Sequence, residues 1–247
     1  MFDDLIYYVL SALAVLIILT IHEYSHGYMA YKLGDNTAKS YGRLTLNPIK
    51  HLDPVGALCL VFFHFGWAKP VPINPRNFKN PKRDFALVAL AGPLSNLIFA
   101  FLSALLYLLV YALFKDVKFS SEFVFSIVNN TLNFIYIFHV VNIGIALFNL
   151  IPIPPLDGSR ILNVILPAKT YFAIMKHERK IYFILLGWLL LGNYVSRFLL
   201  SIPFVAVNPV LSFIAGLFSL TDILGSFFSL VSRGMMSFWR LIPFLNN

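Results

Sequence analysis

TIHEYSHGYMAYKL, residues 20–33, is the stretch that most constrains the fold of this chain. It is apolar and aromatic enough for a membrane helix, yet it contains His22, Glu23 and His26. Ionisable side chains inside a membrane span are costly to bury, so three of them this close together need a shared reason. Ten residues separate His22 from Lys32, the next basic residue, which is about 15 Å of helix. The motif is therefore predicted to lie below the membrane surface.

The composition is that of an integral membrane protein. The 247 residues are 59% hydrophobic and 12% charged, with a mean hydropathy of +0.77. These values lie outside the range of soluble globular domains. The single cysteine, Cys59, excludes an intramolecular disulfide and a four-thiolate metal site. Any metal must therefore use other ligands.

Apolar segments of roughly 20 residues or more mark the expected membrane spans. Residues 5–31, 85–114 and 123–151 are three such segments. Residues 181–207 and 210–231 are expected to add two more, although prolines and an arginine interrupt their pattern. The predicted fold is an all-α polytopic membrane protein with about five spans, or six if an interfacial helix or a broken segment counts as one.

The segment between the first two spans is not an ordinary loop. Its residues 55–68 are apolar and aromatic, but fourteen residues are too few for a helical crossing. Irregular backbone at membrane depth is stable only against protein or a water-filled cavity. We therefore expect a re-entrant or β-like segment over about residues 53–78.

Basic residues are distributed unevenly along this map. Residues 32–83 contain nine of the 19 Lys and Arg residues, residues 160–180 contain five, and Arg233 and Arg240 add two. Because Lys and Arg concentrate in cytoplasmic loops, the N-terminus is predicted outside the cell membrane and the C-terminus inside. The motif at His22 then lies in the cytoplasmic half of the bilayer. The net charge of +8 reflects this orientation and anionic lipid, so no nucleic-acid partner is expected.

The HEYSH motif has the spacing of a metal site. His22 and His26 lie one helical turn apart on the same face, where their ring nitrogens can share a zinc ion. Glu23 can then act as general base on a metal-bound water. The pattern is short and has many accidental matches in soluble proteins, but inside a span it needs an explanation. The alternative is that the imidazoles mark a helix end and hydrogen-bond to neighbouring helices.

A tetrahedral catalytic zinc needs a third protein ligand, and Asp53 and Asp157 compete for this place. The first and third spans run in the same direction, so their ends lie on the same side of the membrane. Asp157 follows the third span in FNLIPIPPLDGSR, where prolines stop the helix. Asp157 is therefore favoured as the ligand of one zinc ion per chain, with a helix cap as the alternative.

These motifs resemble the site-2 proteases, zinc metalloproteases that cut within the membrane. HEYSH in the first span and NLIPIPPLDG after the third carry the resemblance, and GWAKPVPINPRNFKNPKRD and LAGPLSN strengthen it. The chain looks like the compact bacterial members that lack PDZ and CBS domains. The resemblance implies a catalytic core with three helices over residues 1–165, followed by C-terminal transmembrane helices and a tail over residues 166–247.

The resemblance also implies roles for single residues. His22, His26 and Asp157 would bind the zinc ion, and Glu23 would be the base in hydrolysis of peptide bonds of transmembrane segments. Asn149 matches a family asparagine that holds the oxyanion or the substrate backbone, which agrees with an amide donor stabilising negative charge. The alternative for this asparagine is an interhelical hydrogen bond.

The expected partners are a membrane-protein or membrane-peptide substrate and the lipid bilayer, and the oligomeric state stays open. The alternative function is a membrane transporter or metal-binding scaffold that uses the same ligands without hydrolysis. Such a protein would bind zinc but would not need Glu23. LAGPLSN is expected to favour close helix packing through Gly92 and Asn96, without a part in catalysis.

A short stretch between the first two spans is a candidate for substrate binding. In KPVPINP, residues 69–75, the prolines lack backbone donors while Val71 and Ile73 keep theirs. Alternate residues of a strand present their N–H groups to the same edge. We expect a short edge strand near the site that pairs with the backbone of an unwound substrate. The alternative is a plain extended loop on the membrane surface.

Overall fold

The computed structural model describes residues 2–63, 66–217, 219–242 and 245. The described residues are helical with irregular connections and contain no β-strand. The helices are, in chain order, α1 (Phe2–Lys32), α2 (Thr37–Ser40), η1 (Pro48–Lys50), α3 (Pro54–Phe63), η2 (Pro75–Asn77), α4 (Pro81–Phe114), α5 (Glu122–Asn149), α6 (Asp157–Ile165), α7 (Ala168–Met175), α8 (Glu178–Leu200), α9 (Pro203–Val207), α10 (Pro209–Gly216) and α11 (Leu220–Trp239).

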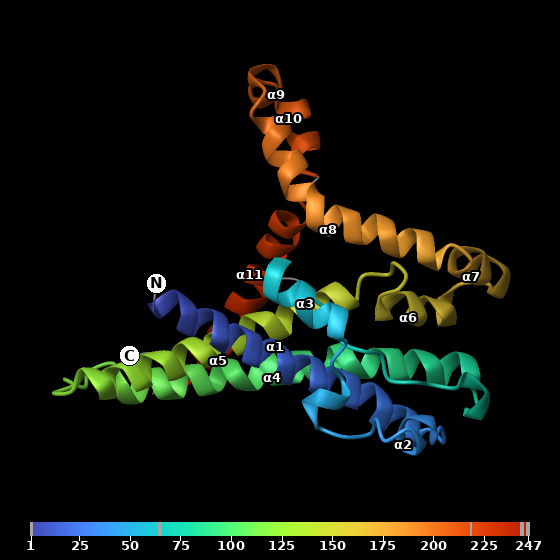
Figure 1. Cartoon of the computed structure of the whole chain (residues 1–247), viewed down its shortest axis with the longest axis horizontal. Coiled ribbons are helices and arrows are strands. Elements are labelled where there is room, and N and C mark those ends of the chain that lie inside the picture. The colour runs from blue at the N-terminus through green and yellow to red at the C-terminus, as the bar shows by residue number, and fades with distance from the viewer. Residues whose placement is uncertain (1, 64–65, 218, 243–244, 246–247) are drawn as a thin grey trace.

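Three of these helices, α1, α4 and α5, are long and apolar enough to cross a membrane. They run side by side along the long axis of the molecule, and α4 packs against both of the others (Figure 1). Their bounds agree within a few residues with the first three predicted spans. The chain is therefore a multi-pass membrane protein built on a three-helix core.

Small side chains allow α4 to approach its neighbours closely. The buried face of this helix consists largely of small residues, which are Ala86, Ala89, Ala91, Gly92, Ala100, Ser103 and Ala104. Lipid is as apolar as the side chains, so membrane helices associate by close packing rather than by a hydrophobic driving force. A row of small residues serves this packing, and α4 becomes the central helix of the core.

The C-terminal region differs from the two predicted spans. The two halves of α8 meet at an angle of 50°, and if they form one span the number of candidate spans rises from three to four. Residues 210–231, expected as one span, are divided between α10 and α11. Pro203 and Pro209 each begin a helix, where a missing N–H costs nothing. Helices α9 and α10 project from the core (Figure 1). The count of five spans is not confirmed.

The segment between α1 and α4 contains α3 and a stretch without regular structure. Within the expected region 53–78, α3 covers the first part, and residues 64 and 65 lie outside the described residues. An isolated antiparallel bridge joins Leu52 and Ala68, and residues 69–74 continue without helix or strand. The expected edge strand is thus a non-helical segment without ladder pairing among the described residues, and a re-entrant path remains a prediction.

The turn after α5 brings the chain back toward α1. Three prolines between α5 and α6, Pro152, Pro154 and Pro155, prevent the helix from continuing. At Gly158 a β-carbon would collide with the carbonyl groups of Leu150 and Ile151. Only glycine permits this close approach of backbone to backbone. As a result α6 starts at Asp157, beside the middle of the core.

Candidate metal centre

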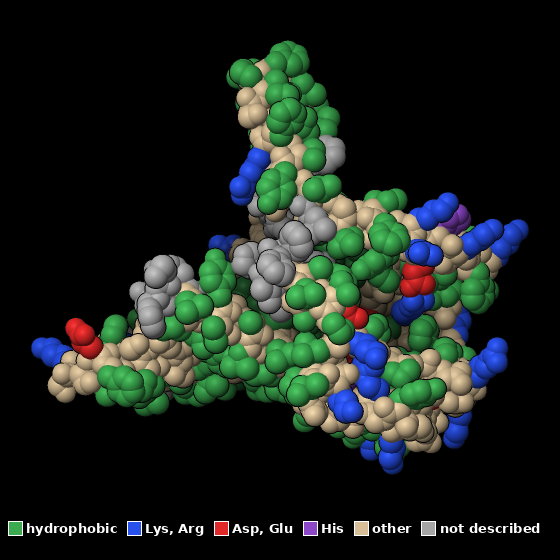
Figure 2. Space-filling view, viewed as in Figure 1, with side chains coloured by type: hydrophobic (Ala, Val, Ile, Leu, Met, Phe, Trp, Pro, Cys, Tyr) green, Lys and Arg blue, Asp and Glu red, His purple; other side chains and the backbone are tan. Residues whose placement is uncertain are grey.

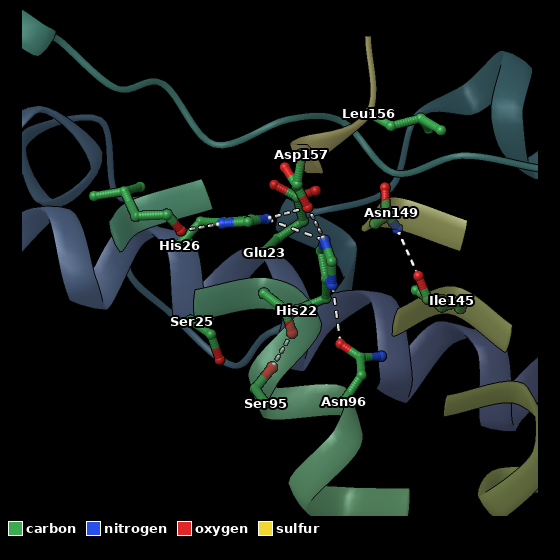
Figure 3. A network of polar contacts seen from close by, with 12 residues as sticks. His22, Glu23, Ser25, His26, Ser95, Asn96, Ile145, Asn149, Leu156 and Asp157 are labelled. Carbon is green, nitrogen blue, oxygen red and sulfur yellow. Dashed lines mark hydrogen bonds and ion pairs between the residues drawn. The ribbon is translucent and has the colours of Figure 1, made fainter. Parts of the chain in front are cut away.

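Three side chains from two helices converge in the core. His22 and His26 lie one turn apart on α1, and Asp157 is the first residue of α6. The two Nε2 atoms are 3.0 Å apart, and Asp157 Oδ2 lies 3.1 Å from that of His22 and 3.2 Å from that of His26 (Figure 3). Both histidines are buried, with 4% and 6% of the residue surface exposed. The three donor atoms thus form a nearly equilateral triangle.

The second ring nitrogen of each histidine is held by α4. His26 Nδ1 donates to the carbonyl oxygen of Val88 at 2.7 Å, and His22 Nδ1 donates to Asn96 Oδ1 at 2.9 Å. These acceptors keep the proton of each neutral imidazole on Nδ1, which leaves a lone pair on each Nε2. The two lone pairs then face each other and the carboxylate of Asp157. Such a cluster of acceptors is unfavourable unless a cation lies between them.

The triangle has the dimensions of a zinc site. Zinc–nitrogen and zinc–oxygen bonds of about 2.0–2.1 Å in a tetrahedron place the ligand atoms roughly 3.3–3.4 Å apart. The three separations here are 3.0, 3.1 and 3.2 Å. Two imidazoles and one carboxylate, with a fourth position left for water or substrate, form the usual donor set of a catalytic zinc. The residues present therefore fit this metal.

Gly92 lets α4 pass directly over the two histidines. A β-carbon at this position would overlap His26 Nε2 and Cε1 and His22 Cε1. Any larger residue would force the imidazoles out of the triangle, because the contacts are far shorter than van der Waals distance. Gly92 and Asn96 are four residues apart, so both lie on the face of α4 that covers the site.

Glu23 lies beside the triangle and is fixed by a distant part of the chain. Its Oε2 atom accepts a hydrogen bond of 2.8 Å from the backbone N–H of Val71. Val71 is buried, and it packs against Gly27 one turn further along α1. The segment after Lys69 therefore runs against α1 at the site, close to where the substrate strand is predicted, although it forms no strand. The Val71 N–H, however, already has a partner in the protein itself.

A cavity of about 1030 Å³ opens beside the triangle. Its walls come from α1, α4, α5, α6, α8, α11 and the segment from Gly66 to Ile73, and most of the lining is apolar. Arg160 on α6 and Glu178 on α8 form an ion pair across its wall, with Nη2 and Oε1 2.5 Å apart. The cavity is large enough for several residues of an extended chain.

The other predicted site residues lie around this cavity. Ile73 and Asn149 both line it, but the Asn149 amide donates to the Ile145 carbonyl of its own helix at 3.0 Å (Figure 3). Asp53, the competing third ligand, also lines the cavity, and its Oδ1 accepts from the N–H groups of Val55 and Gly56 at the start of α3. Asp157 is the carboxylate that lies against the histidines.

Sequence reasoning did not identify the residues of α4 that hold the two imidazoles. Gly92 and Asn96 were expected to act in helix packing alone, whereas Asn96 also accepts from His22. Val88 accepts from His26 through its backbone carbonyl, and every residue has such a group, so the sequence gives no sign of this contact. The four-residue spacing of Gly92 and Asn96 in an apolar helix was the available signal, since a buried asparagine needs a polar partner.

Comparison with known proteins adds to this geometry. The model of Peptidase family M50 matches residues 10–191. The chain is 42% identical over 200 residues to "Putative zinc metalloprotease YwhC" of Bacillus subtilis (strain 168), covering 78% of this chain and 89% of that protein. It is 31% identical over 162 residues to "Putative zinc metalloprotease Rip2" of Mycolicibacterium smegmatis (strain ATCC 700084 / mc(2)155), covering 63% of this chain and 57% of that protein. No solved structure matches the chain.

The matched region includes the metal centre and its surroundings. It begins in the first half of α1 and ends within α8, so it contains His22, His26 and Asp157 together with all of α4 and α5. It covers well over half of the chain, and one relative is matched over most of both sequences. The chain belongs to peptidase family M50, the site-2 protease family that its motifs resemble.

Proposed function

We propose that the chain is a zinc-dependent endopeptidase that hydrolyses peptide bonds of transmembrane segments. The observation that carries the proposal is the triangle of His22, His26 and Asp157 on membrane-length helices, with the carboxylate of Glu23 beside it. A transporter or scaffold would have no use for a carboxylate next to the ligands. The names of the two relatives, which are those of zinc metalloproteases, support the choice of metal and reaction.

His22, His26 and Asp157 would hold the zinc ion. When bound, zinc polarises the carbonyl of the scissile bond and lowers the pKa of water. Glu23 is the general base: it takes a proton from the attacking water and returns it to the nitrogen of the leaving amine. The Val71 N–H on Oε2 orients this carboxylate and leaves Oε1 to carry the proton. Val88 and Asn96 hold the imidazoles with their Nε2 atoms facing each other and Asp157, where they would bind the metal.

The substrate enters the cavity as an extended chain, because a peptide bond inside a helix is shielded from attack. We assign Val71 and Ile73 to this step, since both line the cavity. The Val71 N–H is bound to Glu23, so Val71 offers its side chain to the substrate and not its backbone donor. The N–H of Ile73 makes no hydrogen bond to a described residue, so it is the donor that a substrate carbonyl meets first. Replacing Ile73 by proline removes this donor, and slower cleavage at unchanged zinc content is the expected result.

Asn149 is proposed as the donor that stabilises the developing oxyanion. Its amide lies on the cavity wall and donates to its own helix at Ile145. A change of its side-chain torsions exchanges this bond for one to the substrate. Loss of one such donor costs roughly 10²–10³-fold in the rate of the chemical step. Asn149→Ala is therefore expected to lower kcat strongly while leaving the affinity for zinc nearly unchanged.

We also propose that the protein lies in the cell membrane with its N-terminus outside and its site in the cytoplasmic half. The prediction of an inside C-terminus does not fit this arrangement, because α11 runs antiparallel to α5 and ends near the second half of α4, toward the α4–α5 turn. Lys and Arg side chains gather over α2, the start of α4 and the turn between α7 and α8, whereas the opposite end of the core carries few charges (Figure 2). This asymmetry supports the orientation, because basic residues stay on the cytoplasmic side. Labelling of single introduced cysteines in intact cells tests it. Labelling of the α4–α5 turn from outside is expected, and labelling of α2 from outside would contradict it.

Glu23→Gln tests the reaction itself. The variant is expected to bind zinc like the wild type and to cleave a membrane-embedded substrate in liposomes at least roughly 10²–10⁴-fold more slowly, the range for loss of a general base. Zinc content and product formation are measured on the same preparation. Membrane-fragment peptides that accumulate only in cells with the wild type would identify substrates. Cleavage by the variant at the wild-type rate would refute the role of Glu23 and favour a metal-binding scaffold.

A further inference from the structure

Asp35, which lies outside the metal centre, is a buried carboxylate without an ion pair to any described residue. Its exposed fraction is 0%. Four donors satisfy it: the N–H and hydroxyl of Thr37, the N–H of Asn74 at 2.7 Å and the side-chain amide of Asn77 at 2.7 Å. Burial alone would raise the pKa of Asp35, but these hydrogen bonds outweigh it and hold the pKa below its usual range. The group is therefore charged at neutral pH, which strengthens each bond.

The backbone ties Asp35 rigidly to α1, the helix that carries two of the three metal ligands. Gly34 adopts a positive φ of 105°, a conformation that favours glycine. The N–H of Asp35 bonds to the carbonyl of Ala30, and that of Gly34 to the carbonyl of Tyr31. This pair of bonds is the Schellman arrangement, which ends a helix and fixes the two residues that follow it. The carboxylate is thus a fixed extension of α1.

Two of the four donors belong to the segment that reaches the active site. Asn74 and Asn77 are 39 and 42 residues away from Asp35 in the chain. From Asn74 the segment runs back to Val71, a distance of about 10 Å in extended backbone. There it packs against Gly27 and donates to Glu23. The segment is therefore bound to α1 through one carboxylate at each end.

A second bond holds the segment before Val71. Arg43 is buried, and its Nη2 donates to the carbonyl oxygen of Lys69 at 2.7 Å, while the Lys69 N–H donates to the His51 carbonyl at 2.8 Å. These bonds fix the chain where it leaves the bridge between Leu52 and Ala68. Among the described residues, the hydrogen bond that joins residues 70–73 to α1 is the one from Val71 to Glu23, and the side chains of Val71 and Ile73 pack against the same helix. The bonds at Lys69 and Asn74 therefore hold the segment on either side of the residue whose N–H meets Glu23.

We propose that Asp35 is a positioning residue of the peptidase: by holding Asn74 and Asn77 it fixes the segment 70–74 so that the Val71 N–H orients the carboxylate of Glu23. The inference rests on the proposed role of Glu23 as the base. It adds a residue that touches neither metal nor substrate, twelve positions after the base in the chain. We call Asp35 with its bonds to Asn74 and Asn77 the Asp35 anchor. Loss of this anchor is expected to lower the rate of the reaction while the metal ligands stay in place.

Asp35→Asn in the full-length protein is the first test. The substitution keeps the size of the side chain but places an amide N–H₂ opposite a backbone N–H or the Thr37 donors, so at least one bond is lost. We expect faster amide exchange in residues 70–74, unchanged zinc content, and a kcat lowered roughly tenfold or more, in the range found when supporting residues are removed. Asn77→Ala, which removes one bond and leaves the charge in place, is expected to give a smaller defect of the same kind.

Thr37→Val is the matched control. It removes the hydroxyl bond to the same carboxylate but leaves both bonds of Asp35 to Asn74 and Asn77, so amide exchange in 70–74 and kcat should stay within about twofold of the wild type. An equal loss of kcat in this control would show that Asp35 acts through general stability. Zinc content and amide exchange of α4 show whether each variant is folded.

A double-mutant cycle with Val71→Pro tests the route of the effect. Val71→Pro removes the N–H that Glu23 accepts, so adding Asp35→Asn should lower kcat no further, whereas independent effects would multiply. Multiplying effects, or an unchanged kcat in Asp35→Asn, would overturn the proposal. The proposed function fails separately, if Glu23→Gln still cleaves at the wild-type rate. The amide-exchange result does not depend on cleavage at all.

Discussion

The metal centre and the cluster of hydrogen bonds around Asp35 are two buried polar clusters, one on α1 and one just beyond its end, and they are satisfied in opposite ways. At the anchor one carboxylate faces four hydrogen-bond donors. At the centre the Asp157 carboxylate faces two imidazoles whose Nδ1–H groups donate hydrogen bonds to Val88 and Asn96, so their Nε2 atoms have no proton to donate to it. The anchor is complete with protein atoms alone, whereas the centre is completed by a cation.

This difference distinguishes a cluster that stabilises the fold, around Asp35, from a cluster that binds a ligand, around Asp157. A buried polar group without a partner costs free energy, so a site made of facing acceptors is stable only with its ligand. A carboxylate with four donors stabilises the fold and offers nothing to a ligand. The same residue type therefore serves as ligand at position 157 and as scaffold at position 35.

Asp157→Asn should have the largest effect on the centre. The amide keeps the shape of the carboxylate but removes the negative charge from the triangle. Zinc binding is expected to weaken by roughly 3–5 kcal/mol, the cost of removing one partner from a buried charged group. Metal analysis of the purified variant and competition with a zinc chelator measure it. Zinc affinity equal to that of the wild type would exclude Asp157 as a ligand.

Gly92→Ala should disturb the centre by steric overlap alone. The added methyl group meets both imidazoles, so we expect weaker zinc binding by an amount near the upper end of roughly 1–3 kcal/mol, the usual cost of overpacking. Gly234→Ala on α11 is the control, because a β-carbon there meets open space. Unchanged zinc binding in Gly92→Ala would mean that α4 does not cover the histidines as described.

Asn96→Ala should weaken the centre without touching the metal. It leaves His22 Nδ1 without its acceptor, so the ring loses the partner that fixes its tautomer. Zinc affinity is expected to fall about tenfold, at the lower end of the range for such residues. Asn142→Ala is the control, since this buried asparagine donates to Phe138 in its own helix. Equal losses in the two variants would point to helix packing as the cause.

The smallest effect concerns the pH dependence of the anchor. The pKa of Asp35 is lowered in the folded protein, so its contribution to stability is full above the ordinary value of 3.8 and is lost as the pH falls below it. Thermal unfolding of wild type and Asp35→Asn in detergent, followed from about pH 5 to about pH 3, should therefore converge on acidification. Parallel curves across this interval would show that the charge of Asp35 is not the stabilising feature.

Much of the core could be predicted from local pattern. The lengths of apolar segments predict α1, α4 and α5 within a few residues at each end, because a spanning helix must be long and uncharged. The C-terminal helices were harder, since their hydrophobic runs are interrupted by prolines and charges. Residues 210–231 form parts of two helices and not one, and the pattern of hydrophobicity does not reveal such a break.

In KPVPINP, residues 69–75, the alternation of proline with residues that keep a backbone N–H does not reveal where those N–H groups bind. The alternation in KPVPINP predicts a short edge strand, but residues 69–74 form neither strand nor helix, and the 3-10 helix η2 begins at Pro75. Alternation also predicted that the Val71 N–H would be open to substrate, whereas it bonds to Glu23. Which partner a backbone donor finds depends on what packs against it, and α1 does so at Gly27.

Local sequence pattern is enough to predict that two imidazoles share one face of an apolar helix and that a carboxylate follows the third span on the same side. Helical spacing and membrane thickness are local rules, and they act on neighbouring residues. Tertiary structure alone decided that Val88 and Asn96 hold the imidazoles, that Gly92 makes room for them, and that Asp35 anchors the segment behind Glu23. These contacts join positions up to 74 residues apart, so they depend on how whole helices pack.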